Sequence, residues 1–392
     1  MSTDTASDVA AAPPEVRYRI VSVDDHLIEP PDLFEGRMPA ALADRAPRID
    51  TLPNGRQAWI YEDGIYANVG LNAVIGRPKE EWSMEPANFE EMRRGCWDVA
   101  ARIEDMDLAG IAASVCFPSL IAGFSGTVFF RSKDPALGEA CVRAWNDWHH
   151  EAWAGAAPGR LIPLQITWLG DPEVAAAMVR ENAERGFRAL SFPEYPSRTG
   201  LPSIRSGAWD PLFAACEETE TVLCLHTGSA SWAPIPCEDP NFELFPTLFP
   251  ANAFLACADW LWSGVCTRFP RLAIALSEGG VGWVNMLADR VDYVLDHSAS
   301  GTESTGWHDD RRPSEVLAES FWFCTIDDPS TLDGVLERFG PDHVMLEVDY
   351  PHADSTWPDT QDLVHRRLGH LPADVIAKLT HENATRLFRW QI

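Results

Sequence analysis

The sequence predicts an α/β fold, a (β/α)₈ TIM barrel in which strands 1 and 5 are each followed by a long insertion. Short runs rich in apolar and β-branched residues alternate with stretches of helical periodicity, and most of these runs end in a polar or turn residue. Parallel strands have this appearance because helices bury both faces of a parallel sheet. A chain of 392 residues is long enough for one such barrel with insertions.

Eight runs qualify as barrel strands, and the stretches between them have the amphipathic pattern of helices that cover a barrel. The predicted strands are Tyr18–Val23, Ala113–Phe117, Leu161–Thr167, Ala189–Phe192, Thr221–His226, Leu272–Ser277, Phe321–Thr325 and Val344–Val348. The predicted helices include Pro135–Trp153, Pro172–Gly186, Asp210–Glu218, Val281–His297 and Pro329–Phe339.

The insertions cover about residues 32–98 and 227–270, and residues 17–392 are expected to form a single domain. Both insertions follow the C-terminal end of a strand, which is the catalytic face of a (β/α)₈ barrel. The second is rich in aromatic residues, which either line an apolar pocket or form a small core under the loop. From these and the sixth strand we expect Trp232, Trp262 and Trp283 to bind substrate.

Composition excludes several classes of function. The net charge of −28 argues against nucleic acid or an anionic membrane as a partner, because both require a basic surface. No apolar run is long enough to cross a bilayer. The nine cysteines form no C-x-x-C pair and are expected to be reduced, as in a cytoplasmic protein. Residues 1–16 have no signal-peptide pattern and are expected to be a disordered tail.

The strongest chemical signal is the end of the first strand, where Asp24 and His26 are followed by Glu29. Residues two apart on a strand share a face, so Asp24 and His26 can bind one cation. Such a triplet is also common as a simple polar strand ending.

Three other strands end in residues of similar chemistry. His226 closes the fifth strand, either as a metal ligand or as a hydrogen-bond partner of a loop. Glu278 follows the sixth strand beside two glycines, either at a ligand site or as an acid near a helix N-terminus. Asp349 and His352 follow the last strand, and Glu347 shares a strand face with Asp349 unless it is buried deeper with a basic partner. Barrel closure would bring all these strand ends to one rim.

With these residues the sequence resembles the amidohydrolase-related family, a branch of the amidohydrolase superfamily that includes aminocarboxymuconate-semialdehyde, resorcylate and carboxyvanillate decarboxylases. The resemblance extends from Tyr18 to the C-terminus and includes the segments Arg102–Ile111, Phe269–Pro270 and Asp349–His352. It implies a metal-dependent TIM barrel with one divalent ion, zinc, manganese or iron. The ligands implied by the resemblance are Asp24, His26, His226 and Asp349.

Two features depart from the family pattern. Asp24 stands where many relatives have histidine or glutamate, and it retains an oxygen ligand. Glu278 stands where relatives have a histidine that assists proton transfer. We therefore treat Glu278 both as a further metal ligand and, with Asp349 and His352, as a catalytic residue.

Two reactions fit these residues. The first is hydrolysis or non-oxidative decarboxylation of a small carboxylated or carbonyl substrate, in which the ion activates water and polarises a substrate oxygen. The second is oxygen activation by a nonheme diiron monooxygenase of natural-product biosynthesis, because the rim resembles a carboxylate-rich branch of the superfamily. Glu29 and Glu278 would then be bridging or second-site ligands of a second iron. A binding protein that kept the barrel without turnover is a third alternative, and a homo-oligomer is compatible with the sequence.

Overall fold

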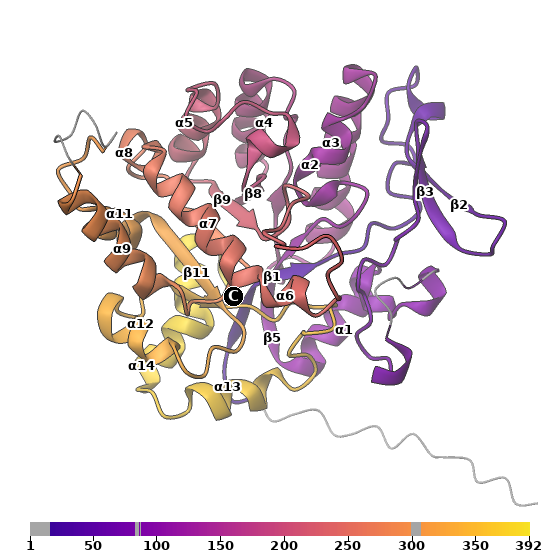
Figure 1. Ribbon diagram of the computed structural model, residues 1–392. Helices are drawn as coiled ribbons and strands as arrows, with labels where there is room; N and C mark the ends of the chain where they lie inside the picture. The colour runs from indigo at the N-terminus through magenta and orange to yellow at the C-terminus, as the bar shows by residue number, and fades with distance from the viewer. Residues whose placement is uncertain (1–15, 83–85, 87, 299–306) are drawn as a thin grey trace, which may run out of the picture.

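A computed structural model describes residues 16–82, 86, 88–298 and 307–392, and a barrel of parallel strands forms its centre (Figure 1). The expected N-terminal tail lies outside these residues except for Val16. One sheet has the strand order β1-β5-β6 and the other has β12-β11-β10-β9-β8-β7. The bounds are β1 Ile20–His26, β5 Ile111–Phe117, β6 Leu161–Ile162, β7 Leu164–Gln165, β8 Ala189–Ser191, β9 Val222–His226, β10 Ile274–Ser277, β11 Phe321–Thr325 and β12 Val344–Leu346.

Backbone hydrogen bonds join the two sheets into a closed barrel. The Asp349 N–H donates to the Asp24 carbonyl at 2.9 Å, and the His26 N–H donates to the Tyr350 carbonyl at 2.6 Å. These bonds connect the chain after β12 to β1, so the first and last strands are neighbours. The prediction of a (β/α)₈ barrel is confirmed.

Six of the eight predicted strands agree with the structure to within two residues at each end, and two differ by more. The predicted third strand is divided into β6 and β7 because Pro163 lies between them and has no N–H to donate. Strand β1 continues to His26, three residues beyond the predicted end, so Asp24 and His26 belong to the strand itself.

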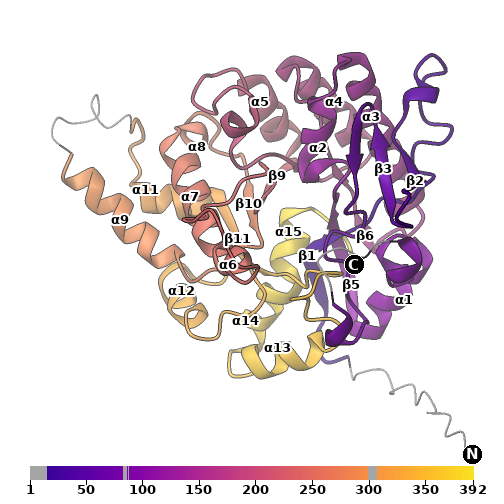
Figure 2. The ribbon, with the colours of Figure 1, turned by 45° about the vertical axis from the view of Figure 1, so that its right-hand side comes forward.

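Helices surround the strands, and Figure 2 shows them as an outer ring. Their bounds are α1 Val99–Ala109, α2 Gly123–Phe130, α3 Pro135–Trp148, α4 Pro172–Glu184, α5 Asp210–Thr219, α6 Leu244–Thr247, α7 Phe249–Trp262, α8 Val265–Arg268, α9 Val284–Asp296, α11 Pro313–Ser320, α12 Leu332–Phe339, α13 Thr360–Leu368, α14 Ala373–Ala377 and α15 Asn383–Leu387. Within the described residues, no helix has both the length and the apolar composition that a membrane span requires.

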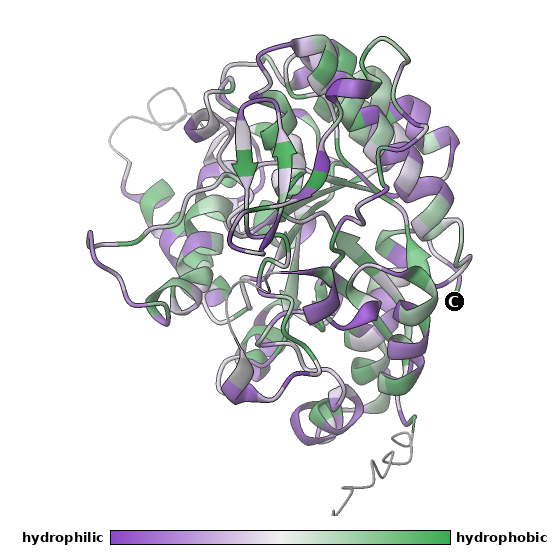
Figure 3. Ribbon diagram, turned by 90° about the vertical axis from the view of Figure 1, so that its right-hand side faces the viewer, coloured by the Kyte–Doolittle hydropathy of each residue, from purple (hydrophilic) through white to green (hydrophobic). Residues whose placement is uncertain are grey.

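The first insertion contains a small antiparallel sheet that the sequence did not predict. Its strands are β2 Arg48–Thr51, β3 Gln57–Tyr61 and β4 Gly64–Tyr66, in the order β2-β3-β4. Figure 3 views the protein from the side of this sheet, whose strands carry both hydrophobic and hydrophilic colours. Trp59 on β3 is buried, and its ring packs edge to face on Phe34 at 5.9 Å between centroids. The second insertion forms α6, α7 and α8. Residues of α6 and the start of α7 lie near the C-terminal ends of the strands, whereas α8 leads into the start of β10 at the outside of the barrel.

Candidate metal centre

Four strand ends bring the predicted ligands together inside the barrel mouth. Asp24 and His26 lie on β1, His226 is the last residue of β9, Glu278 directly follows β10 and Asp349 follows β12. Asp24, His26, His226 and Asp349 are buried, and the side chain of Glu278 is 14% exposed. The expectation that closure of the barrel would gather these residues agrees with their positions.

The tightest group is formed by Asp24, His26 and His226. The Nε2 atoms of the two histidines are 3.0 Å apart. One carboxylate oxygen of Asp24 lies 3.7 Å from Nε2 of His26, and the other lies 3.5 Å from Nε2 of His226. Three side chains therefore direct their donor atoms at one small volume.

A hydrogen bond determines which nitrogen of His226 is available to a ligand. Nδ1 of His226 lies 2.7 Å from the backbone carbonyl of Thr227, which can only accept. Nδ1 must therefore carry the proton. Burial lowers the pKa of His226 to about 3, so the ring is neutral and Nε2 presents a lone pair. This is the arrangement in which a histidine binds a metal ion while its other nitrogen is held by the protein.

The donor atoms fit a divalent cation. Both carboxylate oxygens of Asp24 are buried with no hydrogen-bond partner among the described residues, which is costly for a charged group in the absence of a cation. Two nitrogen ligands at about 2.0–2.1 Å from one ion would be about 3 Å apart, as the two Nε2 atoms are. Two imidazoles with two carboxylates suit zinc, manganese or iron.

Asp349 and His352 extend this group on the side of β12. One oxygen of Asp349 lies 3.5 Å from Nε2 of His26 and 2.9 Å from Nδ1 of His352. The ring of His352 also packs on that of His26, with 4.1 Å between centroids. His26, Asp349 and His352 thus form a second possible ligand group that shares His26 with the first.

Glu278 approaches the group from β10. One of its carboxylate oxygens is 3.5 Å from Nε2 of His226, and its N–H donates to Glu347 at 3.1 Å. With Asp349 and Asp354 it forms a third group of converging carboxylates. Helix α9 begins only at Val284, so Glu278 is not in the first turn of that helix. The helix-terminus interpretation of Glu278 therefore loses its basis.

The raised pKa values of the buried carboxyl groups at the site indicate that these groups lack a positively charged partner. Burial, followed by the nearby charges of Glu347, Asp349 and Glu278, raises the pKa of Asp24 well above its usual value. Burial raises the pKa of Glu278 and of Asp349 in the same direction, and raises that of Glu347 to about 8. A cation bound among these groups would offset their repulsion.

Two of the acidic residues have a backbone conformation that is unusual for residues other than glycine. Asp349 has φ +58° and Glu278 has φ +59°. Left-handed conformations of this kind are unfavourable for residues with a β-carbon and concentrate at functional sites. Glu278 directly follows β10 and Asp349 lies three residues after β12, and a carboxylate oxygen of each lies 3.5 Å from a histidine Nε2.

The structure does not bring Glu29 into any of the three groups. Its two carboxylate oxygens accept hydrogen bonds from the N–H and hydroxyl of Ser119, at 3.0 and 2.5 Å, and from the indole of Trp145 at 3.2 Å. A carboxylate with these partners is already satisfied. Glu29 as a metal ligand is therefore a prediction that the geometry does not favour.

The three tryptophans predicted to bind substrate also lie elsewhere. Trp232 packs on Tyr195 and under the guanidinium of Arg198, 3.8 Å from the ring centroid. Trp262 packs on Trp307. Trp283 is buried and its indole donates to the Gly279 carbonyl at 2.9 Å. The sequence therefore indicated that aromatic residues are abundant near the site, but it did not indicate which of them face the metal centre.

A cavity of about 350 Å³ opens next to the metal centre, at Glu278 and His352. It is lined by Leu71, Asn72, Phe124, Thr227, Gly228, Phe242, Phe245, Pro246, Phe249, Glu278, His352, Ala353 and Asp354. The sequence analysis did not single out Asp354, Phe124 or Leu71. The only sequence signal was their position, because each lies in a segment that follows a barrel strand.

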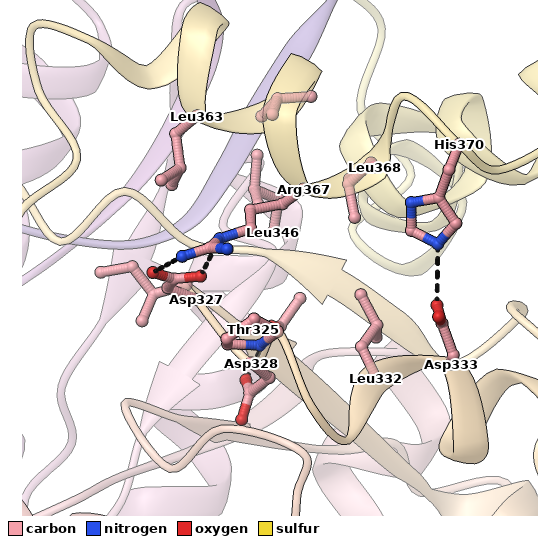
Figure 4. A pocket seen from close by; sticks show the side chains of 13 residues that line it. Thr325, Asp327, Asp328, Leu332, Asp333, Leu346, Leu363, Arg367, Leu368 and His370 are labelled. Carbon is pink, nitrogen blue, oxygen red and sulfur yellow. Dashed lines mark hydrogen bonds and ion pairs between the residues drawn. The ribbon is translucent and has the colours of Figure 1, made fainter.

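A second recess lies between α12 and α13 and is too small to be the active site (Figure 4). Its volume of about 30 Å³ has room for only one or two water molecules. Ion pairs cross it from Arg367 to Asp327 at 2.6 Å and from His370 to Asp333 at 3.1 Å. These pairs are partly exposed, and the recess contains none of the converging ligand atoms.

Comparisons with known proteins agree with this description. A family model described as Amidohydrolase matches residues 26–390. The fold is similar to an amidohydrolase from Mycobacterium avium subsp. paratuberculosis K-10, with a TM-score of 0.74, 19% sequence identity, and coverage of 95% of this chain and 99% of that one.

Two decarboxylases have the same fold. For 5-carboxyvanillate decarboxylase from Sphingomonas paucimobilis the TM-score is 0.64 at 19% identity, covering 95% of this chain and 100% of that one. For dihydroxybenzoic acid decarboxylase from Polaromonas sp. JS666, solved with bound manganese and the inhibitor 2-nitroresorcinol, the TM-score is 0.66 at 16% identity, covering 95% and 97%.

Proposed function

This chain belongs to the amidohydrolase family, and we propose that it is an enzyme whose divalent metal ion is held by Asp24, His26, His226 and Asp349. The proposed reaction is hydrolysis or non-oxidative decarboxylation of a small carboxylated or carbonyl substrate. One observation carries the proposal: buried Nε2 atoms 3.0 Å apart face an Asp24 carboxylate that has no other partner. Manganese in a decarboxylase of the same fold supports manganese as the first ion to test.

A divalent ion at such a site polarises a substrate oxygen or a water molecule as a Lewis acid. The contribution of the protein is to hold the ligands in place before substrate binds. The carbonyl of Thr227 fixes the ring of His226, and the left-handed turn at Asp349 directs that carboxylate toward His26. Burial excludes water, which strengthens the electrostatic interactions among these groups.

Glu278 and His352 are the proposed proton-transfer residues, because both face the metal centre and both line the cavity. Burial raises the pKa of Glu278, which favours a protonated carboxyl that can act as an acid. Burial lowers the pKa of His352 to about 4, which favours a neutral ring that can accept a proton. In decarboxylation Glu278 would protonate the carbon that loses CO₂, and in hydrolysis it would protonate the leaving group.

The diiron monooxygenase remains an alternative without support from the relatives described above. The group of Glu278, Asp349 and Asp354 is the part of the structure that would have to hold the second ion. Asp354 is exposed, unlike the ligands of the first group. We therefore propose one ion per chain.

The proposal is tested with protein loaded with Mn²⁺ under nitrogen and incubated with two panels, one of aryl carboxylates and one of esters, amides and lactones. Release of CO₂ or of acid should occur without oxygen and should be lost in Asp349→Asn. An Asp349→Asn protein with wild-type turnover would show that the assigned site does not carry the reaction. Turnover only in the presence of O₂ and a reductant would contradict this proposal and would show that the enzyme is an oxygenase.

For location, we propose the cytoplasm. All nine cysteines are free thiols, and eight of them are buried, which suits a reducing compartment. The proposed partner is a small molecule.

A further inference from the structure

The cavity beside the metal centre determines what kind of molecule can extend from the ion. Glu278 and His352 form its inner end, and residues of α6 and α7 form its outer end. A substrate whose reacting group is at the metal must therefore place the rest of its body against these walls. Cavities of about 300–1,000 Å³ accommodate ligands of drug size, so this one has room for more than a single small ring.

Four phenylalanine rings contribute to the wall. Phe124 lies next to the ligands, with its ring 4.9 Å from that of His226 and 5.4 Å from that of His26. Phe245 and Phe249 pack edge to face with 5.1 Å between centroids. Phe245 is 36% exposed and Phe242 is 49% exposed. A ligand in the cavity would cover this apolar surface and gain the associated hydrophobic free energy.

The wall has no permanently positive side chain. Its acidic side chains are those of Glu278 and Asp354, and among the described residues the lining includes no lysine or arginine. A second carboxylate on the substrate would lose its hydration against phenylalanine rings without gaining a cationic partner. Anions of that kind are therefore disfavoured beyond the metal.

We propose that this site selects substrates with an uncharged, mainly aromatic or aliphatic body of more than one ring, and rejects those with a second acidic group. The inference rests on the proposed function, because the metal ion is taken to bind the reacting group. Phe124 contacts the part of the body nearest the ion, and Phe245 and Phe249 contact the distal part. Selectivity arises from the absence of a positive charge in the wall as well as from apolar contact.

The test uses hydroxamates, which carry the same metal-binding head on different bodies. Binding of acetohydroxamate, benzohydroxamate, biphenyl-4-carbohydroxamate and 4-carboxybenzohydroxamate to the Mn²⁺-loaded protein is measured by calorimetry. Relative to benzohydroxamate, the biphenyl compound should bind about tenfold more tightly and the 4-carboxy compound about tenfold more weakly. Equal affinities for the three aromatic compounds would overturn the inference.

Substitutions in the cavity wall test whether the differences in hydroxamate affinity arise from contacts with that wall. Phe249→Ala should weaken the biphenyl compound about tenfold and leave acetohydroxamate unchanged. Phe254→Ala is the matched control, because Phe254 is on the same helix but packs on Trp283, outside the cavity. Phe249→Arg should improve binding of 4-carboxybenzohydroxamate relative to benzohydroxamate. No such reversal, in a protein that still binds acetohydroxamate, would contradict the inference.

Acetohydroxamate separates the two proposals. If acetohydroxamate binds and the aromatic hydroxamates bind no more tightly than it does, the cavity does not select apolar substrates, while the proposed metal centre stands. If neither manganese nor acetohydroxamate binds, the proposed function fails and the inference fails with it.

Discussion

Nε2 of His26 and Nε2 of His226 are 3.0 Å apart, although 200 residues separate them in the chain. Both nitrogens face the carboxylate of Asp24 in a buried space. Packing of strands β1 and β9 into one barrel produces this contact, and a shared ion accounts for two nitrogens at that distance.

Metal content should depend on these residues. His226→Ala and Asp349→Ala should each lose stoichiometric metal, because each removes a donor atom from the proposed site. Elemental analysis after dialysis measures the loss, and circular dichroism checks that the barrel remains folded. His370→Ala is the control, because that histidine is exposed and pairs with Asp333, away from the proposed ligands. Full metal content in both variants would refute the ligand assignment.

Glu278→Gln distinguishes two roles of one carboxylate. As a proton donor, Glu278 should be needed for turnover but not for metal binding, and we expect the variant to keep its metal while kcat falls about 10²–10⁴-fold. Loss of metal in parallel with activity would instead identify Glu278 as a ligand. A fully active and fully metallated variant would exclude both roles.

Ion count should be one per chain. Glu29→Gln should leave the count unchanged, because Ser119 and Trp145 already satisfy that carboxylate. Asp354→Asn should also leave it unchanged, because Asp354 is the exposed member of the third group. A fall from two ions to one in either variant, together with turnover that requires O₂, would favour the diiron alternative.

Glu194 should affect the metal site without touching it. Its carboxylate accepts hydrogen bonds from the N–H groups of Gly228 at 2.9 Å and Ala230 at 2.7 Å, and so holds the loop that follows His226. Glu194→Ala should therefore weaken Mn²⁺ binding about 10–100-fold, as is usual when support of a ligand is lost. Glu218→Ala, which removes only an exposed ion pair with Arg180, should have no effect in the same titration.

Stability should respond to pH and metal together. The folded protein raises the pKa of Glu347 to about 8, and raises those of Asp24, Glu278 and Asp349 from their usual values. Raised carboxyl pKa values contribute stability that is present below the pKa of the unfolded chain, about 4.5 for glutamate, and is lost as pH rises toward 8.

Metal-free protein should consequently have a lower Tm at pH 8 than at pH 5.5. The rise in Tm on adding Mn²⁺ should be larger at pH 8, because the ion binds the deprotonated groups. Thermal unfolding with EDTA or with MnCl₂ at both pH values measures this difference. An increase in Tm on adding Mn²⁺ that is the same at both pH values would argue against an ion among these carboxylates.

Local patterns in the sequence were enough to predict the eight strand positions and the residues at their ends. Alternation of apolar runs with amphipathic stretches identifies parallel strands, and closure of such strands requires their C-terminal ends to share one rim. The resemblance to the amidohydrolase-related family then implied Asp24, His26, His226 and Asp349 as ligands, and the structure places them in two groups that share His26.

Tertiary structure alone decided which of the remaining residues face the metal. Glu29 turns to Ser119 and Trp145, while Asp354, which the sequence analysis had not selected, joins Glu278 and Asp349. Phenylalanines of the aromatic-rich second insertion line the cavity together with Phe124, which follows β5, whereas the three predicted tryptophans do not line it. Strand ends are determined by a periodicity that can be read locally. The path of a long loop has no such period, because it depends on contacts with distant segments, so the residues that it presents to the site emerge only when the whole chain is folded.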